Sequence, residues 1–170
     1  MLQSDVPKRS AYGQLLEDGF AGGAFNAADA LHEYSYEKVL ANITAYVGDP
    51  RVGWVRGFYN ESLTTGLVRE HGMQPALYVE IDCDLYSSSR SALTWLFDHG
   101  LIVPGTVLGY DDFRIGGDYG ELRAHREAVK KYQVDLAPLV NGSEFCCFVV
   151  KACSTCSPQP APIMSTAPAG

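Results

Sequence analysis

The stretch ALYVEIDCD (residues 76–84) decides the fold that the sequence predicts. Its first six residues are mostly apolar, which predicts a strand buried on both faces, as strands of parallel sheets are. The stretch ends in Asp82 and Asp84, with one cysteine between them. A second apolar run, residues 106–110, predicts another buried strand and ends directly in Asp111 and Asp112. Both buried strands therefore end in acids.

Helical patterns alternate with strands along the rest of the chain. Alternation of this kind predicts an α/β fold with a Rossmann-like sheet of about five strands, mostly parallel with right-handed crossovers and closed by an antiparallel hairpin. We expect helices over 36–47, with Val39, Leu40, Ile43 and Val47 on a buried face, over 60–70, with Leu63, Leu67 and Val68 facing inward, and over 121–132. A further helix should begin at a cap by Ser88 or Ser89 and end at Gly100. Strands are expected over 51–56, 133–140 and 143–151, the last two joined by a type I′ turn at Asn141-Gly142.

Length and charge exclude several classes of protein. The 170 residues, 46% hydrophobic and 19% charged, suit one folded domain. The net charge of −7 argues against a nucleic-acid partner and an anionic membrane, because both attract basic surfaces. No apolar run approaches the roughly 20 residues of a membrane-spanning helix. The first ten residues do not form a secretory signal.

The cysteines and the ends of the chain complete the expected organisation. Five cysteines, an odd number, favour a reducing compartment and hence a cytoplasmic protein. The lone Cys153-x-x-Cys156 pair lacks the further ligands of a zinc site. We expect a glycine-rich lid or loop over 1–35, the α/β domain over 36–152, and a Ser-, Pro- and Ala-rich tail without fixed structure over 153–170.

The acids at the strand ends form the candidate site. Ligands of open α/β sheets bind at the carboxyl ends of the strands, where Asp82, Asp111 and Asp112 would meet. Grouped carboxylates repel one another unless a cation lies among them, and Mg²⁺ prefers oxygen ligands. The three acids are therefore candidate metal ligands, and Asp84 is a candidate general base. The alternative is that these acids only cap helices and form loops.

These motifs resemble the macrocin O-methyltransferase family, class I enzymes of the TylF/MycF type that depend on S-adenosylmethionine. The resemblance spans about residues 12–151, and the combination D-x-D-L-Y-x-S with a following D-D is fairly specific. The stretches that carry it are residues 78–89, Val103 to Val107, Asp111-Asp112-Phe113, Glu121 and His125-Arg126-Glu127-Ala128, and more weakly Glu17 to Phe20 and Gly23 to Phe25.

The resemblance implies a role for each matching residue. It implies metal binding by Asp82, Asp111 and Asp112, with Asp84 as the base that deprotonates a sugar-type hydroxyl of a small-molecule acceptor. It also implies that the turn Arg56-Gly57-Phe58-Tyr59 passes near the adenine of the cofactor. The candidate cofactor-binding residues are Gly57, Phe58, Tyr59 and Asp82.

One departure from the family pattern concerns the cofactor. Class I methyltransferases hold S-adenosylmethionine with a glycine-rich turn after their first strand, where glycine lets the backbone approach the ligand. No strand–G-x-G–helix unit precedes Tyr36, so we expect a sheet that lacks its first βαβ unit. The alternatives are a non-catalytic methyltransferase-like interaction module and a D-x-D glycosyltransferase. An exposed sheet edge would favour a homodimer.

Overall fold

The computed structural model describes residues 27–115, 120–154 and 156. The chain divides into two compact units, Met1–Gly57 and Phe58–Gly170. Most of the predicted lid, including the weaker motifs at residues 17–25, and most of the predicted tail lie outside the described residues.

The first unit contains two helices, α2 (Ala27–Leu31) and α3 (Tyr36–Val47). Both predicted ends of α3 are confirmed, because residues next to the helix determine them. At the start, the Ser35 hydroxyl accepts from the Lys38 N–H at 3.4 Å, and at the end Gly48 has a φ of 64°. The prediction of a buried face was wrong, since α3 has no buried residue.

The strand expected over 51–56 does not form, and these six residues are exposed. A strand needs a partner for its backbone hydrogen bonds, and the pattern Arg-Val-Gly-Trp-Val-Arg contains no information about one. Instead, the segment returns to α3, where the guanidinium of Arg56 lies 3.9 Å from the centre of the Tyr36 ring.

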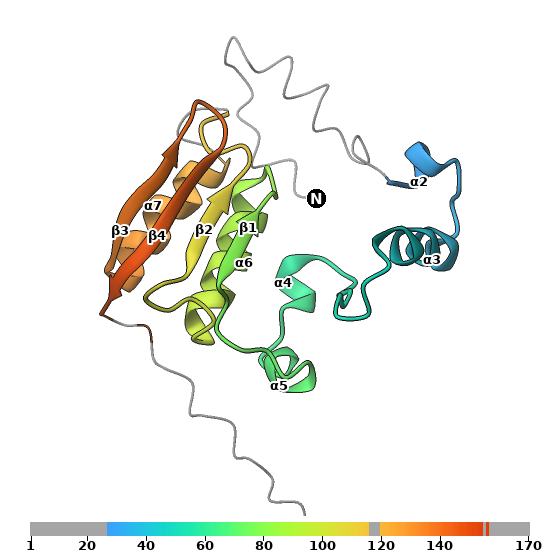
Figure 1. Ribbon diagram of the computed structural model, residues 1–170, viewed down its shortest axis with the longest axis horizontal. Coiled ribbons are helices and arrows are strands. Elements are labelled where there is room, and N and C mark those ends of the chain that lie inside the picture. Colours follow the sequence, from blue (N-terminus) through green and yellow to red (C-terminus); the bar gives the residue numbers. More distant parts are fainter. Residues whose placement is uncertain (1–26, 116–119, 155, 157–170) are drawn as a thin grey trace, which may run out of the picture. The chain divides into compact units, whose positions relative to one another are not determined.

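The second unit is built on a mixed sheet (Figure 1). Its described residues form four strands in the order β1-β2-β4-β3. Only β1 and β2 pair in parallel, because β4 pairs antiparallel with both of its neighbours. The predicted α/β class and the predicted terminal hairpin are confirmed. The prediction of about five strands, most of them parallel, was wrong. The strands are β1 (Tyr78–Ile81), β2 (Val107–Tyr110), β3 (Val134–Asn141) and β4 (Cys146–Cys153).

Two helices, α6 (Tyr86–Asp98) and α7 (Gly120–Tyr132), pack on one face of this sheet (Figure 1). Ala92, Leu93 and Phe97, which the sequence spaces along one face of a helix, are buried there. The prediction that β1 is buried on both faces was wrong, because Tyr78 and Glu80 are exposed on the face of the sheet opposite α6 and α7. The predicted serine cap was also wrong, since α6 begins after Leu85 and buries Ser89 within its first turn.

The helix expected over 60–70 is two short helices, α4 (Tyr59–Ser62) and α5 (Leu67–Glu70). The sequence Thr64-Thr65-Gly66 between them joins three weak helix formers. At the break, the Thr64 carbonyl accepts from the Trp95 indole N–H at 2.9 Å and from the Leu67 N–H at 3.3 Å. Leu67 and Val68 are buried with Trp95, so their predicted inward orientation is confirmed.

The hairpin turn is longer than predicted. Asn141 pairs with Cys146, which leaves four loop residues in place of a two-residue Asn-Gly turn. The Gly142 N–H donates to the Phe145 carbonyl at 3.1 Å across this loop. The pairing register extends β3 by one residue and overrides the local turn signal.

Cys153 and Cys156 are joined in a disulfide, which the sequence analysis did not predict. Among the described residues, no helix combines the length and the apolar character needed to cross a membrane.

His125 lies in the core of the second unit. Its Nδ1 lies 3.0 Å from the Tyr110 hydroxyl, and the rings of Phe113 and Phe148 pack around it. Burial, together with the charge of Arg126, lowers the pKa of His125 to about 4. The neutral imidazole is therefore the form that the folded state stabilises.

We predict that this histidine destabilises the fold in acid. Between pH 6.5 and pH 4 the unfolded chain binds the proton and the folded chain does not, so the free energy of unfolding falls by up to about 3 kcal/mol as pH drops. In His125→Gln this pH-dependent loss of unfolding free energy should disappear. The difference in free energy of unfolding between wild type and His125→Gln should therefore become smaller from pH 7 to pH 4. Urea denaturation measures the difference. The exposed His71→Gln is the control, and a deficit independent of pH in His125→Gln would contradict the prediction.

Candidate metal and cofactor site

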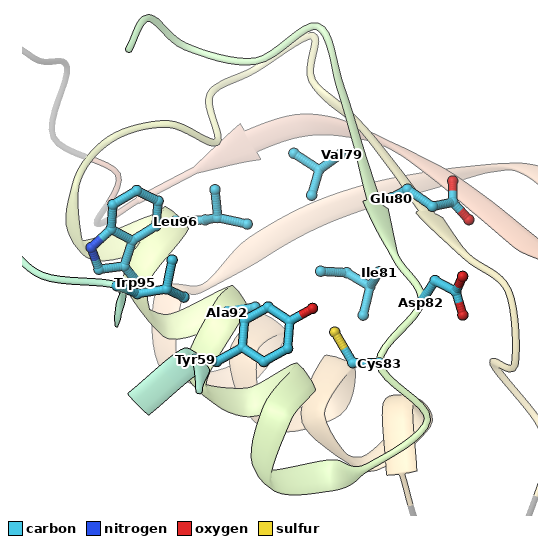
Figure 2. Close-up of a pocket in the computed structure, with 10 residues that line it drawn as sticks. Tyr59, Val79, Glu80, Ile81, Asp82, Cys83, Ala92, Trp95 and Leu96 are labelled. Carbon is cyan, nitrogen blue, oxygen red and sulfur yellow. The ribbon is translucent and has the colours of Figure 1, made fainter. Parts of the chain in front are cut away.

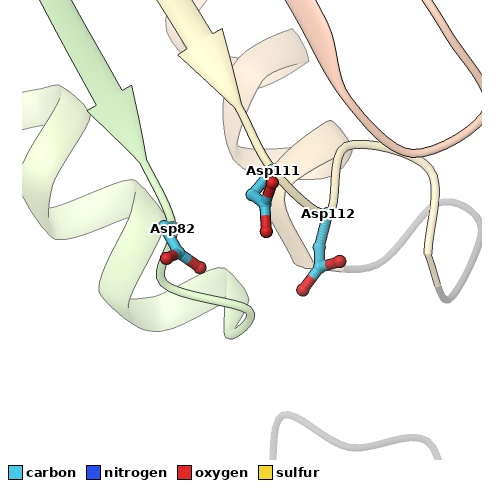
Figure 3. A group of neighbouring side chains, drawn as sticks. All are labelled: Asp82, Asp111 and Asp112. Carbon is cyan, nitrogen blue, oxygen red and sulfur yellow. The ribbon is translucent and has the colours of Figure 1, made fainter.

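Three carboxylates converge at the carboxyl ends of β1 and β2. Asp82 follows Ile81, Asp111 and Asp112 follow Tyr110, and the register pairs Ile81 with Tyr110, so both strands end at the same level. One oxygen from each carboxylate lies within 4.8 Å of the others (Figure 3). Asp82 and Asp111 are exposed, and Asp112 is half-buried. We call these three residues the acid cluster.

The acid cluster fits a hard divalent cation. Its donors are carboxylate oxygens, which Mg²⁺ and Ca²⁺ prefer. Ligands on opposite sides of one ion lie about 4 Å apart for Mg²⁺ and about 5 Å apart for Ca²⁺, twice the metal–oxygen distance. The spacing of the cluster is of this order, and its exposed oxygens leave room for water or a substrate oxygen on the same ion.

Asp84 lies at the tip of the tight turn that follows the cluster's first residue. Its φ is 54°, and the Leu85 N–H donates to the Cys83 carbonyl across the turn. Burial raises the pKa of Asp84 to about 7, helped by a hydrogen bond with the Asp112 side chain and by the charges of Asp112, Asp82 and Glu121. This turn aims the Asp84 carboxyl toward the cluster, where the sequence predicted a base.

Glu121 is a site residue whose position the sequence analysis missed. It is 1% exposed, and its two carboxylate oxygens accept from two different backbone groups. Oε1 accepts from the Cys83 N–H at 3.1 Å, and Oε2 accepts from the Asp112 N–H at 3.2 Å. Burial raises the pKa of this carboxyl to about 7, although these hydrogen bonds oppose the shift. The signal in the sequence that could have identified Glu121 is an acid in the first turn of the next helix after the Asp111-Asp112 pair.

A cavity of about 330 Å³ lies beside β1 (Figure 2). It is lined by residues of β1 and α6, by Tyr59 of α4 and the following Leu63, and by Asp82 and Cys83 directly after β1. The Tyr59 hydroxyl points to the Cys83 thiol, and their hydrogen bond raises the pKa of Tyr59. Cys83 therefore lines the cavity, with its thiol beside the Tyr59 hydroxyl.

Two of the four predicted cofactor residues, Tyr59 and Asp82, line this cavity. Phe58 precedes α4 and is 62% exposed, and Gly57 ends the first unit with a φ of 131°. The structure thus brings two of the four to one place, and their binding role remains a prediction.

Comparison with known proteins supports the fold. No protein-family model matches the chain, and no curated protein matches it either. Ten chains of solved structures match it, among them the O-methyltransferase NovP. That match has a TM-score of 0.53 and 21% sequence identity, and it covers 80% of this chain and 54% of NovP. The chain thus spans about half the length of that structure, and its α/β fold is similar to the fold of NovP over that part.

We predict that Gly120, at the start of α7, sets the position of the Asp84 turn. A Cβ at Gly120 would lie 2.6 Å from the Asp84 carbonyl oxygen, and its φ is 64°. Gly72 has a similar φ of 58° but open space around it, so Gly72→Ala measures the backbone strain alone, about 1–2 kcal/mol. Gly120→Ala should lower the free energy of unfolding further in urea denaturation. Equal losses in both variants would contradict the predicted contact.

Proposed function

We propose that this chain is part of an S-adenosylmethionine-dependent O-methyltransferase that uses a divalent cation. The observation that carries the proposal is the convergence of Asp82, Asp111 and Asp112 at the carboxyl ends of two parallel strands. The likeness to the fold of the O-methyltransferase NovP supports the same reaction class. A hydroxyl of a sugar-like or other small molecule is the proposed acceptor.

The proposed chemistry divides between the acid cluster and Asp84. A bound divalent cation polarises a hydroxyl and lowers its pKa. The cluster would hold that cation, with its exposed oxygens turned outward, so that an acceptor oxygen can approach. Asp84, on the turn beside the cluster, would take the proton of the hydroxyl, because it is the nearby carboxyl that the proposed cation does not require.

The cavity beside β1 is the proposed place for part of the methyl donor. At about 330 Å³ it is at the lower limit of ligand pockets, so it suits one portion of the donor. Tyr59 gives it an aromatic face, and Asp82 belongs both to the cavity and to the acid cluster. Donor and cation would therefore meet at Asp82, which keeps the acceptor oxygen near the reacting methyl group.

We predict that the protein binds Mn²⁺, used here as a paramagnetic probe for the Mg²⁺ site, through the acid cluster. Asp111→Asn should weaken binding about tenfold or more, because ligand charge sets the affinity for hard cations. Electron paramagnetic resonance measures free Mn²⁺. Asp135→Asn is the matched control, since Asp135 is an exposed acid at the opposite end of the sheet. Equal affinity in Asp111→Asn and wild type would leave only the loop-forming role of these acids.

We further predict that S-adenosylhomocysteine, the demethylated product, binds in calorimetry and binds more tightly with Mg²⁺ present. Tyr59→Ala should weaken this binding about tenfold, the loss expected for one aromatic contact. Tyr46→Ala, at a 93% exposed site, is the control. Binding of a nucleotide sugar in its place would favour the D-x-D glycosyltransferase. Binding of neither ligand would favour a non-catalytic interaction module.

A further inference from the structure

Glu121 connects the two loops that carry the acids. Its carboxylate lies between the segment after β1 and the segment after β2, which are far apart in sequence. One oxygen accepts from the Cys83 N–H at 3.1 Å and the other from the Asp112 N–H at 3.2 Å. Cys83 lies between Asp82 and Asp84, so each of these hydrogen bonds holds backbone at or directly beside a residue of the acid cluster.

The carboxylate itself is held firmly in place. Glu121 is 1% exposed and lies in the first turn of α7, so its backbone belongs to a packed helix. The preceding residue, Gly120, lies against the carbonyl oxygen of Asp84. The start of α7 is therefore fitted to the turn after β1 by both backbone and side chain.

A fourth carboxylate, placed behind the three of the acid cluster, has an electrostatic cost, because like charges repel. An apolar residue would fill the core at this position without that cost, but it would leave two buried N–H groups without acceptors. The carboxyl group of Glu121 is consequently best explained by the two backbone N–H groups that its oxygens accept from.

We propose that Glu121 is a positioning residue, whose carboxylate holds the loops after β1 and β2 at the separation at which one divalent cation reaches the whole acid cluster. This inference rests on the proposed function. It gives Glu121 no contact with the cation. Partners of this kind behind metal ligands typically change metal affinity 10- to 100-fold when they are replaced.

The test compares Glu121→Gln with wild type. The glutamine side chain keeps the shape but has one carbonyl oxygen, and its NH₂ group faces a backbone N–H, so one of the two hydrogen bonds is lost. Mn²⁺ binding by electron paramagnetic resonance should weaken 10- to 100-fold. Urea denaturation of each variant verifies that the measurement is made on folded protein.

Thr106→Val is the matched control. Thr106 is also 1% exposed, and its hydroxyl accepts from the Val103 N–H and donates to the Ala76 carbonyl. It lies at the opposite end of β2 from the acids, so it reports loss of buried hydrogen bonds in general. Mn²⁺ affinity in Thr106→Val should stay within about twofold of wild type.

The possible results separate the inference from the proposed function. Wild-type affinity in folded Glu121→Gln, or an equal loss in Thr106→Val, overturns the positioning role alone. Absence of Mn²⁺ binding in wild type overturns the proposed metal site and this inference with it. Weakening in Glu121→Gln alone supports both.

A second measurement decides the question if Glu121→Gln does not fold. In metal-free wild type, amide hydrogen exchange of Cys83 and Asp112 should be slowed at least about 100-fold, although both lie outside the strands. Ser143, exposed in the hairpin loop, provides the fast reference. Exchange at Cys83 and Asp112 as fast as at Ser143 would overturn the inference, because the loops would then not be held before the cation binds.

Discussion

The parallel pairing of β1 and β2 is the constraint on which the candidate site depends. Because Ile81 pairs with Tyr110, both strands end at one level and point their following residues to the same edge of the sheet. Parallel strands require a crossover, and α6 supplies it while burying the apolar face of both strands. The convergence of the three acids is thus a consequence of backbone pairing. Their mutual repulsion destabilises the fold, and burial of the apolar core offsets it.

Much of the fold could be predicted where the signal was local. The ends of α3 follow from Ser35 and Gly48, and the apolar spacing in α6 identifies Leu93 and Phe97 as core residues. Two of the failures involve partners distant in sequence. Residues 51–56 have the composition of a strand but no partner strand. Asn141 pairs with Cys146 in the sheet, although its own sequence context favours a turn.

The candidate site shows the same division. The acid cluster was predictable because a strand-end rule places residues that directly follow neighbouring strands together. Glu121 was not, because its role depends on how α7 is rotated against two loops that are far from it in sequence. The break between α4 and α5 was not predicted either, because the apolar spacing of Leu63, Leu67 and Val68 suits one continuous helix.

The two sides of the acid cluster differ in stiffness. The β2 side is anchored directly behind Asp112, since Phe113 is 4% exposed, packs against the rings of Tyr110 and His125, and donates its N–H to the Glu144 carbonyl at 3.0 Å. On the β1 side, Asp82 is exposed and follows a strand whose pairing in the described residues is with β2 alone. In the proposed metal site, adjustment to cations of different ionic radius would therefore fall to the Asp82 side chain, beside the Cys83 backbone that Glu121 holds, while Asp112 would be the fixed ligand.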